Sequence, residues 1–145
     1  MTRRTIAALG LVATLAGCGR SAPEATTEGR GNGIRWHDSI AAALAGAAAS
    51  GKPVMAYFSS SRCSWCARLD RETFGDAGVR ALANSFEAAK TDAGKDPASA
   101  RAYGIPALPT VLFLDAKGNA AHRVVGFKPP ARFAEEMQEA LAAGR

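Results

Sequence analysis

Two cysteines separated by two residues carry the clearest chemistry in this sequence: Cys63 and Cys66, in the run Cys-Ser-Trp-Cys. Thiols at this spacing can form a disulfide with each other, exchange it with other disulfides, or supply half of a zinc site. Residues 53–59 are apolar and short enough for a buried strand, and helical character follows from Cys63 through about Arg71. We therefore expect Cys63 at the start of a helix that directly follows a strand.

The start of a helix is a place that activates a thiol. Unpaired backbone N–H groups of the first turn can donate to the Cys63 sulfur, and the helix dipole favours negative charge there. Both effects lower the pKa of Cys63, and Arg62 and Arg68 add positive charge nearby. Cys66 falls one turn further along nearly the same face, where its sulfur can attack a mixed disulfide formed at Cys63. The pattern predicts Cys63 as the exposed nucleophile and Cys66 as the buried resolving thiol.

Two structural interpretations of the cysteine pair compete with redox chemistry. One is an inert disulfide, but a loop this small constrains the unfolded chain little. The other is a zinc site, which needs two more ligands. The sequence offers only His37 and His122 as histidines, far apart and not in a paired spacing, and we expect both on the surface. Thiol–disulfide exchange is therefore favoured, and we expect no metal and no other cofactor.

The rest of the chain alternates strand and helix signals. The folded part begins with a short edge strand over 34–36, and Asp38 is the predicted N-cap of an alanine-rich helix over 39–50 that Gly51 closes. The later elements are predicted as strand 53–59, helix 63–71, helix 76–84, strand 86–91, a helix opened by Asp96 and Pro97 that runs to Tyr103, strands 110–114 and 120–126, and helix 130–143. If the two consecutive helices between residues 63 and 84 are counted as one helical segment, this order is βαβαβαββα, and it predicts a single α/β domain whose helices flank a central mixed sheet.

Three further positions resemble the thioredoxin family at the family's separations from the cysteine pair. The segment from Tyr103 to Thr110, Tyr-Gly-Ile-Pro-Ala-Leu-Pro-Thr, is similar to the family's Tyr-Gly-Ile segment that ends in Pro-Thr. Lys90 falls where the family often has a partly buried lysine, and Gly126 falls at the family glycine beside the active site. The resemblance covers the chain from residue 34 onward and rests on the joint spacing. It implies a thioredoxin fold and thiol–disulfide oxidoreductase activity.

The resemblance also implies a substrate site beside the sulfurs. Pro109 becomes the candidate cis-proline, and a cis Leu108–Pro109 bond presents a backbone edge with which an extended substrate strand can pair. Trp65, between the cysteines, is predicted either as a platform for substrate or as a cover for one side of the sulfurs. The residues predicted to support the site are Arg62, Lys90 and Gly126.

Some positions depart from thioredoxin proper. Tyr57 stands where thioredoxins usually carry a buried acid that accepts a proton from the resolving thiol, so that role is unassigned. Asp92, or a water held by Lys90, is a hypothesis for it. Arg62 stands in place of the usual tryptophan before the first cysteine. Together with the Glu-x-Phe of residues 72–74, the Cys-x-Trp-Cys run is more similar to a branch of thioredoxin-like domains that shares this site.

The first residues resemble an export signal. Arg3 and Arg4 precede an apolar run over 6–16 that is too short to span a bilayer. The run ends in Leu-Ala-Gly-Cys, which resembles the lipobox of bacterial lipoproteins, where the cysteine, here Cys18, is lipidated and becomes the first mature residue. Gly19 lacks the aspartate associated with inner-membrane retention in enteric-type bacteria, which suggests delivery to the outer membrane.

We therefore expect three segments: a lipoprotein signal peptide over 1–17, a lipidated cysteine and flexible tether over 18–33, and a thioredoxin-like domain over 34–145. One cysteine takes lipid and two remain as a pair, so none is left over. A disulfide pair fits an oxidising compartment, and we expect the domain on the periplasmic side of a membrane.

Charge narrows the range of partners. The formal net charge is +5, and part of it, Arg3 and Arg4, leaves with the signal peptide. The remaining basic residues form no dense block, so nucleic-acid binding has little support. We expect a monomer that exchanges disulfides with protein thiols and with a redox partner protein. The alternatives left open are a non-catalytic binding module whose cysteine pair stays oxidised and a metallochaperone that uses both thiols.

Overall fold

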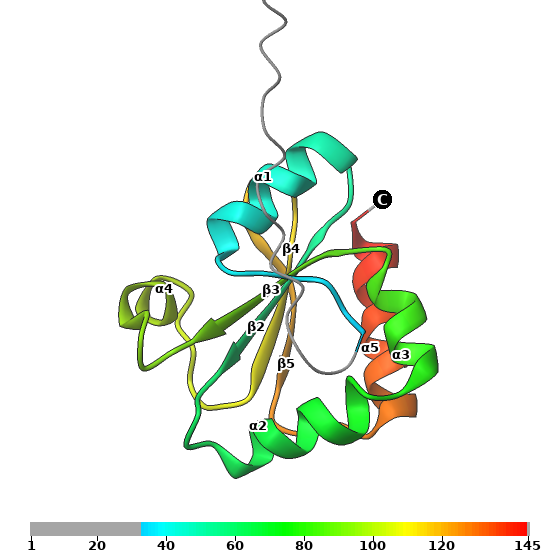
Figure 1. Cartoon of the computed structure of the whole chain (residues 1–145). Helices are drawn as coiled ribbons and strands as arrows, with labels where there is room; N and C mark the ends of the chain where they lie inside the picture. The colour runs from blue at the N-terminus through cyan, green and yellow to red at the C-terminus, as the bar shows by residue number, and fades with distance from the viewer. Residues whose placement is uncertain (1–32, 145) are drawn as a thin grey trace, which may run out of the picture.

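The computed structural model describes residues 33–144, and Figure 1 shows their arrangement. The elements in chain order are β1 (Trp36–His37), α1 (Ile40–Ser50), β2 (Val54–Ser59), α2 (Ser64–Arg68), the π-helical turn η1 (Leu69–Thr73), α3 (Ala77–Ala83), β3 (Glu87–Asp92), α4 (Pro97–Ala102), β4 (Thr110–Leu114), β5 (Ala120–Val125) and α5 (Pro130–Ala143). The predicted signal peptide, Cys18 and the tether up to residue 32 lie outside the described residues. Within residues 33–144, every helix is too short or too polar to cross a membrane.

One sheet organises the domain. Its strands lie in the order β1-β3-β2-β4-β5, with β1 and β2 parallel to β3, and with β4 antiparallel to both β2 and β5. β2 is the central strand, and all of its residues are buried. A mixed sheet flanked by helices confirms the predicted fold class. The register pairs Tyr57 of β2 with Lys90 of β3, which brings this lysine beside the strand that leads to Cys63.

Helices cover both faces of the sheet, as Figure 1 shows. Successive side chains of a strand point to opposite faces, and β2 illustrates the consequence. Val54, Ala56 and Phe58 pack in a cluster with buried residues of α1. Met55 and Tyr57 pack in the other cluster, with residues of α2, η1, α3 and α5. The α2 helix and the turn η1 therefore rest on the same face of the sheet as α3 and α5.

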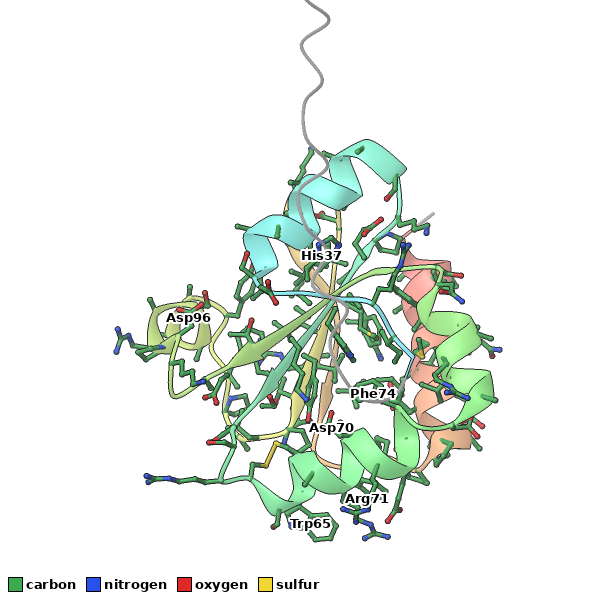
Figure 2. All side chains as sticks on the ribbon, in the orientation of Figure 1. His37, Trp65, Asp70, Arg71, Phe74 and Asp96 are labelled. Atoms are coloured by element: carbon green, nitrogen blue, oxygen red, sulfur yellow. A yellow bond between two sulfur atoms is a disulfide. The ribbon has the colours of Figure 1, made fainter. Side chains whose placement is uncertain are left out.

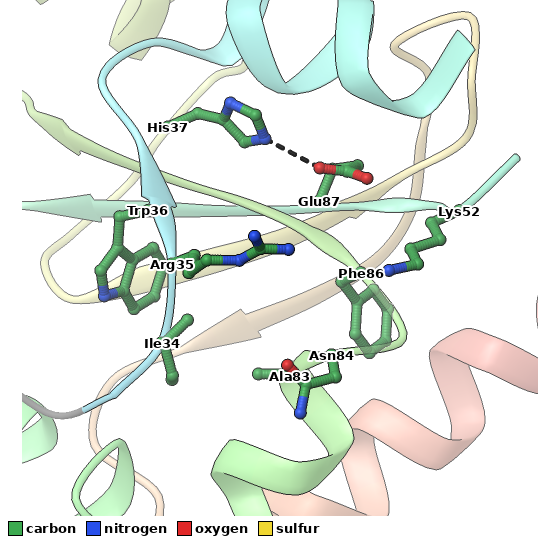
Figure 3. A pocket seen from close by; sticks show the side chains of 9 residues that line it. All are labelled: Ile34, Arg35, Trp36, His37, Lys52, Ala83, Asn84, Phe86 and Glu87. Carbon is green, nitrogen blue, oxygen red and sulfur yellow. Dashed lines mark hydrogen bonds and ion pairs between the residues drawn. The ribbon is translucent and has the colours of Figure 1, made fainter. Parts of the chain in front are cut away.

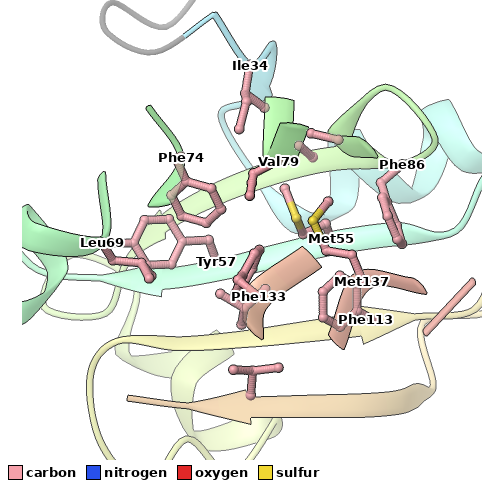
Figure 4. Packing of buried hydrophobic residues seen from close by; sticks show 14 of the residues in the cluster. Ile34, Met55, Tyr57, Leu69, Phe74, Val79, Phe86, Phe113, Phe133 and Met137 are labelled. Atoms are coloured by element: carbon pink, nitrogen blue, oxygen red, sulfur yellow. The ribbon is translucent and has the colours of Figure 1, made fainter. Parts of the chain in front are cut away.

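The second cluster is rich in aromatic rings (Figure 4). The Phe74 ring lies edge-on to Trp36 and Phe133, with centroids 5.2 and 5.3 Å away, and 5.1 Å from the Tyr57 centroid. Such pairs add about 0.5–1.5 kcal/mol each beyond the burial of apolar area. Because Phe74 directly follows η1, this packing fixes the end of the helical segment formed by α2 and η1 to the sheet.

The start of α1 differs from the prediction: Ser39, not Asp38, is the N-cap. Ser39 has extended backbone angles, and its side-chain oxygen accepts a hydrogen bond from the Ala42 N–H at 3.1 Å. The helix begins at Ile40, and the capping residue is the one directly before the first helical residue. Gly51 closes the helix as predicted, with a positive φ of 74° that glycine adopts without steric cost.

The predicted edge strand is shifted along the chain. β1 comprises only Trp36–His37, which pair with Ala88 and Ala89 of β3, instead of residues 34–36. Ile34 lies before the strand and is buried in the aromatic cluster. Its apolar side chain therefore contributes to the core rather than marking a strand.

The predicted helix over 63–71 is real, but it is not uniformly α-helical. α2 spans Ser64–Arg68, and the turn η1 then widens to the π-helical pattern, in which the Phe74 N–H donates to the Leu69 carbonyl at 3.0 Å. A π-helical turn changes which residues share a helix face, and such turns are frequent at functional sites. Side-chain types alone gave no signal for it.

Candidate active site

The cysteine pair lies where the buried central strand ends and the helix begins. Cys63 and Cys66 form a disulfide, with their Cα atoms 5.2 Å apart. Between the end of β2 and Cys63 the chain makes a tight turn, in which the Cys63 N–H donates to the Ser60 carbonyl at 3.1 Å. Cys63 is the N-cap of α2, with extended backbone angles. The predicted position of Cys63 at the start of the helix is therefore confirmed.

The two sulfurs have different surroundings. Cys63 is partly exposed, whereas Cys66 is buried, with 2% of its surface accessible. The Cys63 sulfur accepts a hydrogen bond from the Cys66 N–H at 3.1 Å, which is the first-turn donation expected from the sequence. A thiolate at Cys63 would be stabilised by the same donor. A partner molecule can therefore reach the sulfur of Cys63, whereas the sulfur of Cys66 is shielded from solvent.

The predicted proline loop lies beside α2, because Leu108 and Pro109 line one groove with Trp65. The Leu108–Pro109 peptide bond is cis, as the sequence predicted. The Pro109 carbonyl accepts a hydrogen bond from the Gly126 N–H at 2.8 Å. Gly126 has a φ of 82°, a backbone conformation that glycine adopts readily and that residues with a side chain disfavour. Gly126 thus ties the end of β5 to the proline loop.

An apolar groove runs between the helix and this loop. It is lined by Trp65, Arg68, Leu108, Pro109, Gly126 and Phe127. Trp65 is 54% exposed, and its ring centroid lies 6.0 Å from that of Phe127. Figure 2 shows Trp65 on the outer side of α2. This exposure favours the interpretation of Trp65 as a platform for substrate over its interpretation as a cover for one side of the sulfurs.

The two arginines near the disulfide differ in their contacts. The Arg68 guanidinium lies 4.4 Å from the Phe127 ring centroid and 5.4 Å from the Trp65 centroid. Its Nε also donates to Glu72 at 3.0 Å. Arg62 is exposed, with its backbone N–H bonded to Ser60. Arg68 is therefore a wall of the groove, a role that the sequence did not indicate, and Phe127 was not predicted at all.

A second groove opens on the other side of Cys63. It is lined by Ser59, Ser60, Ser61, Cys63, Ala67, Asp70, Lys90 and Asp92. Lys90 is partly buried, as predicted, and its Nζ lies 2.9 Å from Oδ2 of Asp70. Asp70 was missed by the sequence analysis of this site. The available signal was its spacing, because Cys63, Ala67 and Asp70 follow the four- and three-residue steps of one helix face.

Tyr57 occupies the position where thioredoxins usually carry a buried acid, and it cannot accept the proton of the resolving thiol as that acid does. Its side chain is fully buried, and its hydroxyl donates to the Cys66 carbonyl at 3.3 Å. Burial raises the pKa of the Tyr57 hydroxyl well above its ordinary range, and the charge of Asp70 raises it further. Tyr57 therefore stays neutral and holds the backbone of the resolving cysteine.

The two histidines lie away from the cysteine pair and are half-buried rather than on the surface as predicted. The Nε2 atom of His37 is 2.8 Å from Glu87, in a small pocket at the opposite end of β3 (Figure 3). The Nε2 atom of His122 is 2.6 Å from Glu136. Each imidazole is thus partly buried and in contact with a glutamate carboxylate. Ligand atoms of His122, Glu136 and Glu139 lie within 4.8 Å of one another, but this group contains neither active-site cysteine and so lends no support to a metallochaperone site.

Comparison with known proteins places these features in a family. A family model described as "Thioredoxin-like domain" matches residues 40–141. The thiol:disulfide interchange protein DsbD of Ralstonia nicotianae is 33% identical over an alignment 135 residues long that covers 88% of this chain. The chain spans only 22% of the length of that relative.

Solved structures agree on the fold. A thioredoxin from Thermus thermophilus superposes with a TM-score of 0.71 at 31% identity, covering 77% of this chain and 90% of that one. The C-terminal domain of Neisseria meningitidis DsbD in its oxidised form gives a TM-score of 0.62 at 20% identity, covering 69% of this chain and 90% of that domain. At 20% identity, the second similarity concerns the fold alone.

Proposed function

Since the chain belongs to the thioredoxin-like domain family and carries a disulfide at the start of a helix, we propose that it is a thiol–disulfide oxidoreductase that exchanges disulfides with proteins on the periplasmic side of a membrane. The observation that carries the proposal is the asymmetry of the pair. Cys63 is partly exposed and accepts an N–H hydrogen bond, whereas Cys66 is 2% exposed behind it. Exchange through a mixed disulfide requires a reachable sulfur that attacks first and a second sulfur close enough to resolve the intermediate, and this pair provides both.

The proposed reaction has two displacement steps. The Cys63 thiolate attacks one sulfur of the partner's disulfide, which forms a mixed disulfide and releases the partner's other sulfur as a thiolate. Cys66 loses its proton, and its sulfur attacks Cys63, which releases the second partner sulfur and forms the Cys63–Cys66 disulfide. The partner gains two electrons and the cysteine pair loses two. The reverse sequence transfers the disulfide to a reduced partner.

The apolar groove is the proposed contact surface for the partner chain. The Trp65 and Phe127 rings lie against each other in this groove, and Leu108 and Pro109 add apolar surface to its lining. Large aromatic side chains of this kind dominate binding energy at protein interfaces. Protein disulfides and a redox partner protein, rather than a small ligand, fit an open groove of this composition.

The proposed location rests on the N-terminal sequence. The basic residues Arg3 and Arg4, the apolar run and the Leu-Ala-Gly-Cys that ends in Cys18 support export and lipidation. Gly19 supports the outer membrane as the destination. Cell fractionation of the full chain tests this. We expect the chain in the membrane fraction and a Cys18→Ala variant released from it, and equal release of both would refute the anchor.

A trapping experiment tests the chemistry. In a full chain with Cys18→Ser, Cys66→Ser leaves Cys63 as its only thiol. After mixing with a peptide that carries one disulfide, mass spectrometry should show the peptide covalently attached through Cys63, because the resolving thiol is absent. The matched control, Cys63→Ser with Cys66 intact, should show little attachment because Cys66 is shielded.

The outcomes separate the competing functions. Attachment at Cys63 supports the oxidoreductase on protein disulfides, whereas no attachment at either cysteine would favour a non-catalytic binding module. Tight binding of copper or zinc by the reduced pair, with slow exchange, would favour a metallochaperone. Equilibration with glutathione then gives the reduction potential, which distinguishes a reductase from an oxidase. The finer assignment to the branch with a Cys-x-Trp-Cys site stays a prediction.

A further inference from the structure

The groove beside Cys63 contains a carboxylate with unused acceptor capacity. Oδ2 of Asp70 accepts a hydrogen bond from Lys90 Nζ at 2.9 Å. Oδ1 of Asp70 is buried and has no hydrogen-bond partner within residues 33–144. Leaving a buried acceptor unpaired costs free energy, and few such groups occur in native proteins. An unpaired oxygen in a groove that also contains a reactive sulfur therefore calls for a chemical explanation.

The position of Asp70 relates it to both cysteines. Cys63, Ala67 and Asp70 line the same groove, and Asp70 follows Cys66 by four residues along the helix. Figure 2 shows Asp70 at the side of the helix that faces the sheet, near the yellow disulfide bond. The turn η1, which contains Asp70, has the wider π-helical geometry. Asp70 is thus held between the cysteine-bearing helix and β3.

Tyr57 is the residue that connects Asp70 with the backbone of Cys66. Asp70 contributes to the raised pKa of the Tyr57 hydroxyl, and that hydroxyl donates to the Cys66 carbonyl. The Lys90 ammonium lies 5.2 Å from the centroid of the Tyr57 ring. Tyr57 itself is neutral and fully engaged as a donor. The position that carries an acid in thioredoxins is therefore filled by a residue that cannot accept the proton of the resolving thiol.

We propose that Asp70 accepts the proton of the Cys66 thiol when Cys66 attacks the mixed disulfide, and so replaces the acid that is absent at Tyr57. This inference rests on the proposed exchange reaction. The S–H bond of Cys66 breaks and Asp70 becomes protonated. The Cys66 sulfur forms its bond to Cys63, and the partner's sulfur leaves with the electron pair of the broken mixed disulfide. The proton then passes through the open groove to solvent or to the departing thiolate. In the reverse direction Asp70 returns a proton to Cys66.

The other titratable groups around Asp70 have different tasks. Lys90, from β3, holds Oδ2 and keeps a positive charge beside the carboxylate. Asp92, further along β3, lines the same groove, but its Oδ1 accepts the Gly94 N–H at 2.9 Å and so supports a turn. Tyr57, from β2, is the neutral donor already described. Asp92 is therefore the competing acceptor that an experiment must separate from Asp70.

The test measures the two steps of one turnover separately. The full chain with Cys18→Ser is reduced, mixed with glutathione disulfide, quenched with acid and analysed by mass spectrometry. The adduct at Cys63 reports the first attack, and its decay reports attack by Cys66. Asp70→Asn, Asp70→Glu and Asp92→Asn are compared with Glu135→Gln, which removes a remote carboxylate on α5. Thermal unfolding of each variant verifies that it folds.

Asp70→Asn should leave adduct formation within about twofold and slow adduct decay roughly 10²-fold at pH 7, the usual scale of general base catalysis. Its decay rate should rise about tenfold per pH unit because only preformed Cys66 thiolate reacts, whereas the parent chain should show a shallow pH profile. Asp70→Glu should recover much of the rate. A parent-like pH profile for Asp70→Asn, or a steep profile for Asp92→Asn instead, would overturn the proposal. Absence of any adduct at Cys63 would instead refute the exchange reaction itself.

Discussion

The two ends of β3 each hold a carboxylate against a basic side chain, and they differ in how completely that carboxylate is bonded. At the end where β3 begins, Glu87 Oε2 lies 2.8 Å from His37 Nε2 (Figure 3). The other oxygen of Glu87, Oε1, accepts a hydrogen bond from Ser50 at 2.7 Å. At the end beside the disulfide, Asp70 has one bonded oxygen and one buried oxygen without a partner among the described residues.

This difference suggests different roles for the two ion pairs. The pair of Glu87 and His37 stabilises the fold, whereas the pair of Asp70 and Lys90 is the one proposed to take part in the reaction. Burial raises the pKa of Glu87, but the hydrogen bonds from His37 and Ser50 and the charges of His37 and Lys52 outweigh it, so the pKa lies below its ordinary value. A carboxyl with all its partners stays ionised and ties β1 and α1 to β3. A carboxyl that keeps an oxygen free beside a thiol can exchange a proton. Substitutions at the two ends should therefore separate stability from activity.

The largest effect on activity is expected from Cys63→Ser at the disulfide end. Exchange with a disulfide-bonded peptide should fall to the uncatalysed background because the reachable sulfur is lost. Loss of the small disulfide loop should lower the free energy of unfolding of the oxidised protein by only about 2 kcal/mol. Thiol release under pseudo-first-order conditions and urea unfolding measure the two quantities. Retained exchange would show that Cys66 is reachable, which contradicts its burial.

Trp65→Ala should weaken binding of a protein partner without changing the sulfur chemistry. Loss of an exposed interfacial tryptophan costs more than about 1 kcal/mol, which corresponds to roughly a five- to tenfold rise in KM for a peptide disulfide. The exchange rate with glutathione disulfide should stay within about twofold because that substrate is too small to need the groove. Val125→Ala, which alters another exposed apolar residue at the edge of the sheet, is the matched control and should change neither.

Tyr57→Phe tests whether the buried hydroxyl has a structural or a chemical role. Removal of the hydroxyl leaves the Cys66 carbonyl without this donor and should lower the free energy of unfolding by about 1 kcal/mol. The pH profile of mixed-disulfide decay should keep the shape of the parent's because the neutral hydroxyl carries no proton in the reaction. A flattened or steepened profile would make Tyr57 part of the proton path.

Glu87→Gln should have the smallest effect, and it should act on stability alone. We expect a loss of about 1 kcal/mol at pH 7, because the amide keeps part of the hydrogen bonding, with exchange rates unchanged. Since the folded protein lowers the pKa of Glu87, its stabilising contribution is present above the unfolded pKa and disappears as the pH falls through the folded value. Urea unfolding should therefore show parent and variant converging in acid. A constant difference at all pH values would assign the loss to packing.

The local parts of the site were predictable from the sequence because each depends on a short run of residues. The position of Cys63 at the helix start follows from an apolar strand ahead of it, and the cis Leu108–Pro109 bond was implied by the resemblance of its segment to the thioredoxin family. The N-cap was missed because Asp38 and Ser39 are adjacent and both are good caps. Only the first helical residue decides between them.

The parts that depend on distant segments were not predictable. Lys90 was placed correctly, but its partner Asp70 depends on the register between β2 and β3 and on the turn η1. Phe127 joins Trp65 and Arg68 only because the end of β5 folds back beside the helix. No spacing rule within the sequence connects these pairs.

The wide turn η1 also bears on how this domain can diverge. A π-helical turn holds one more residue than an α-helical turn, so the gain or loss of one residue there can be absorbed by a switch between π-helical and α-helical spacing, which shifts the side chains inside the turn relative to the flanking residues. Cys63 and Cys66 lie before the turn and Phe74 closes it, so such a change leaves the sulfurs and the aromatic anchor in place. A one-codon insertion or deletion could thus move an acid toward or away from the sulfurs while the fold persists, and the protonation chemistry could evolve faster than the scaffold that carries it.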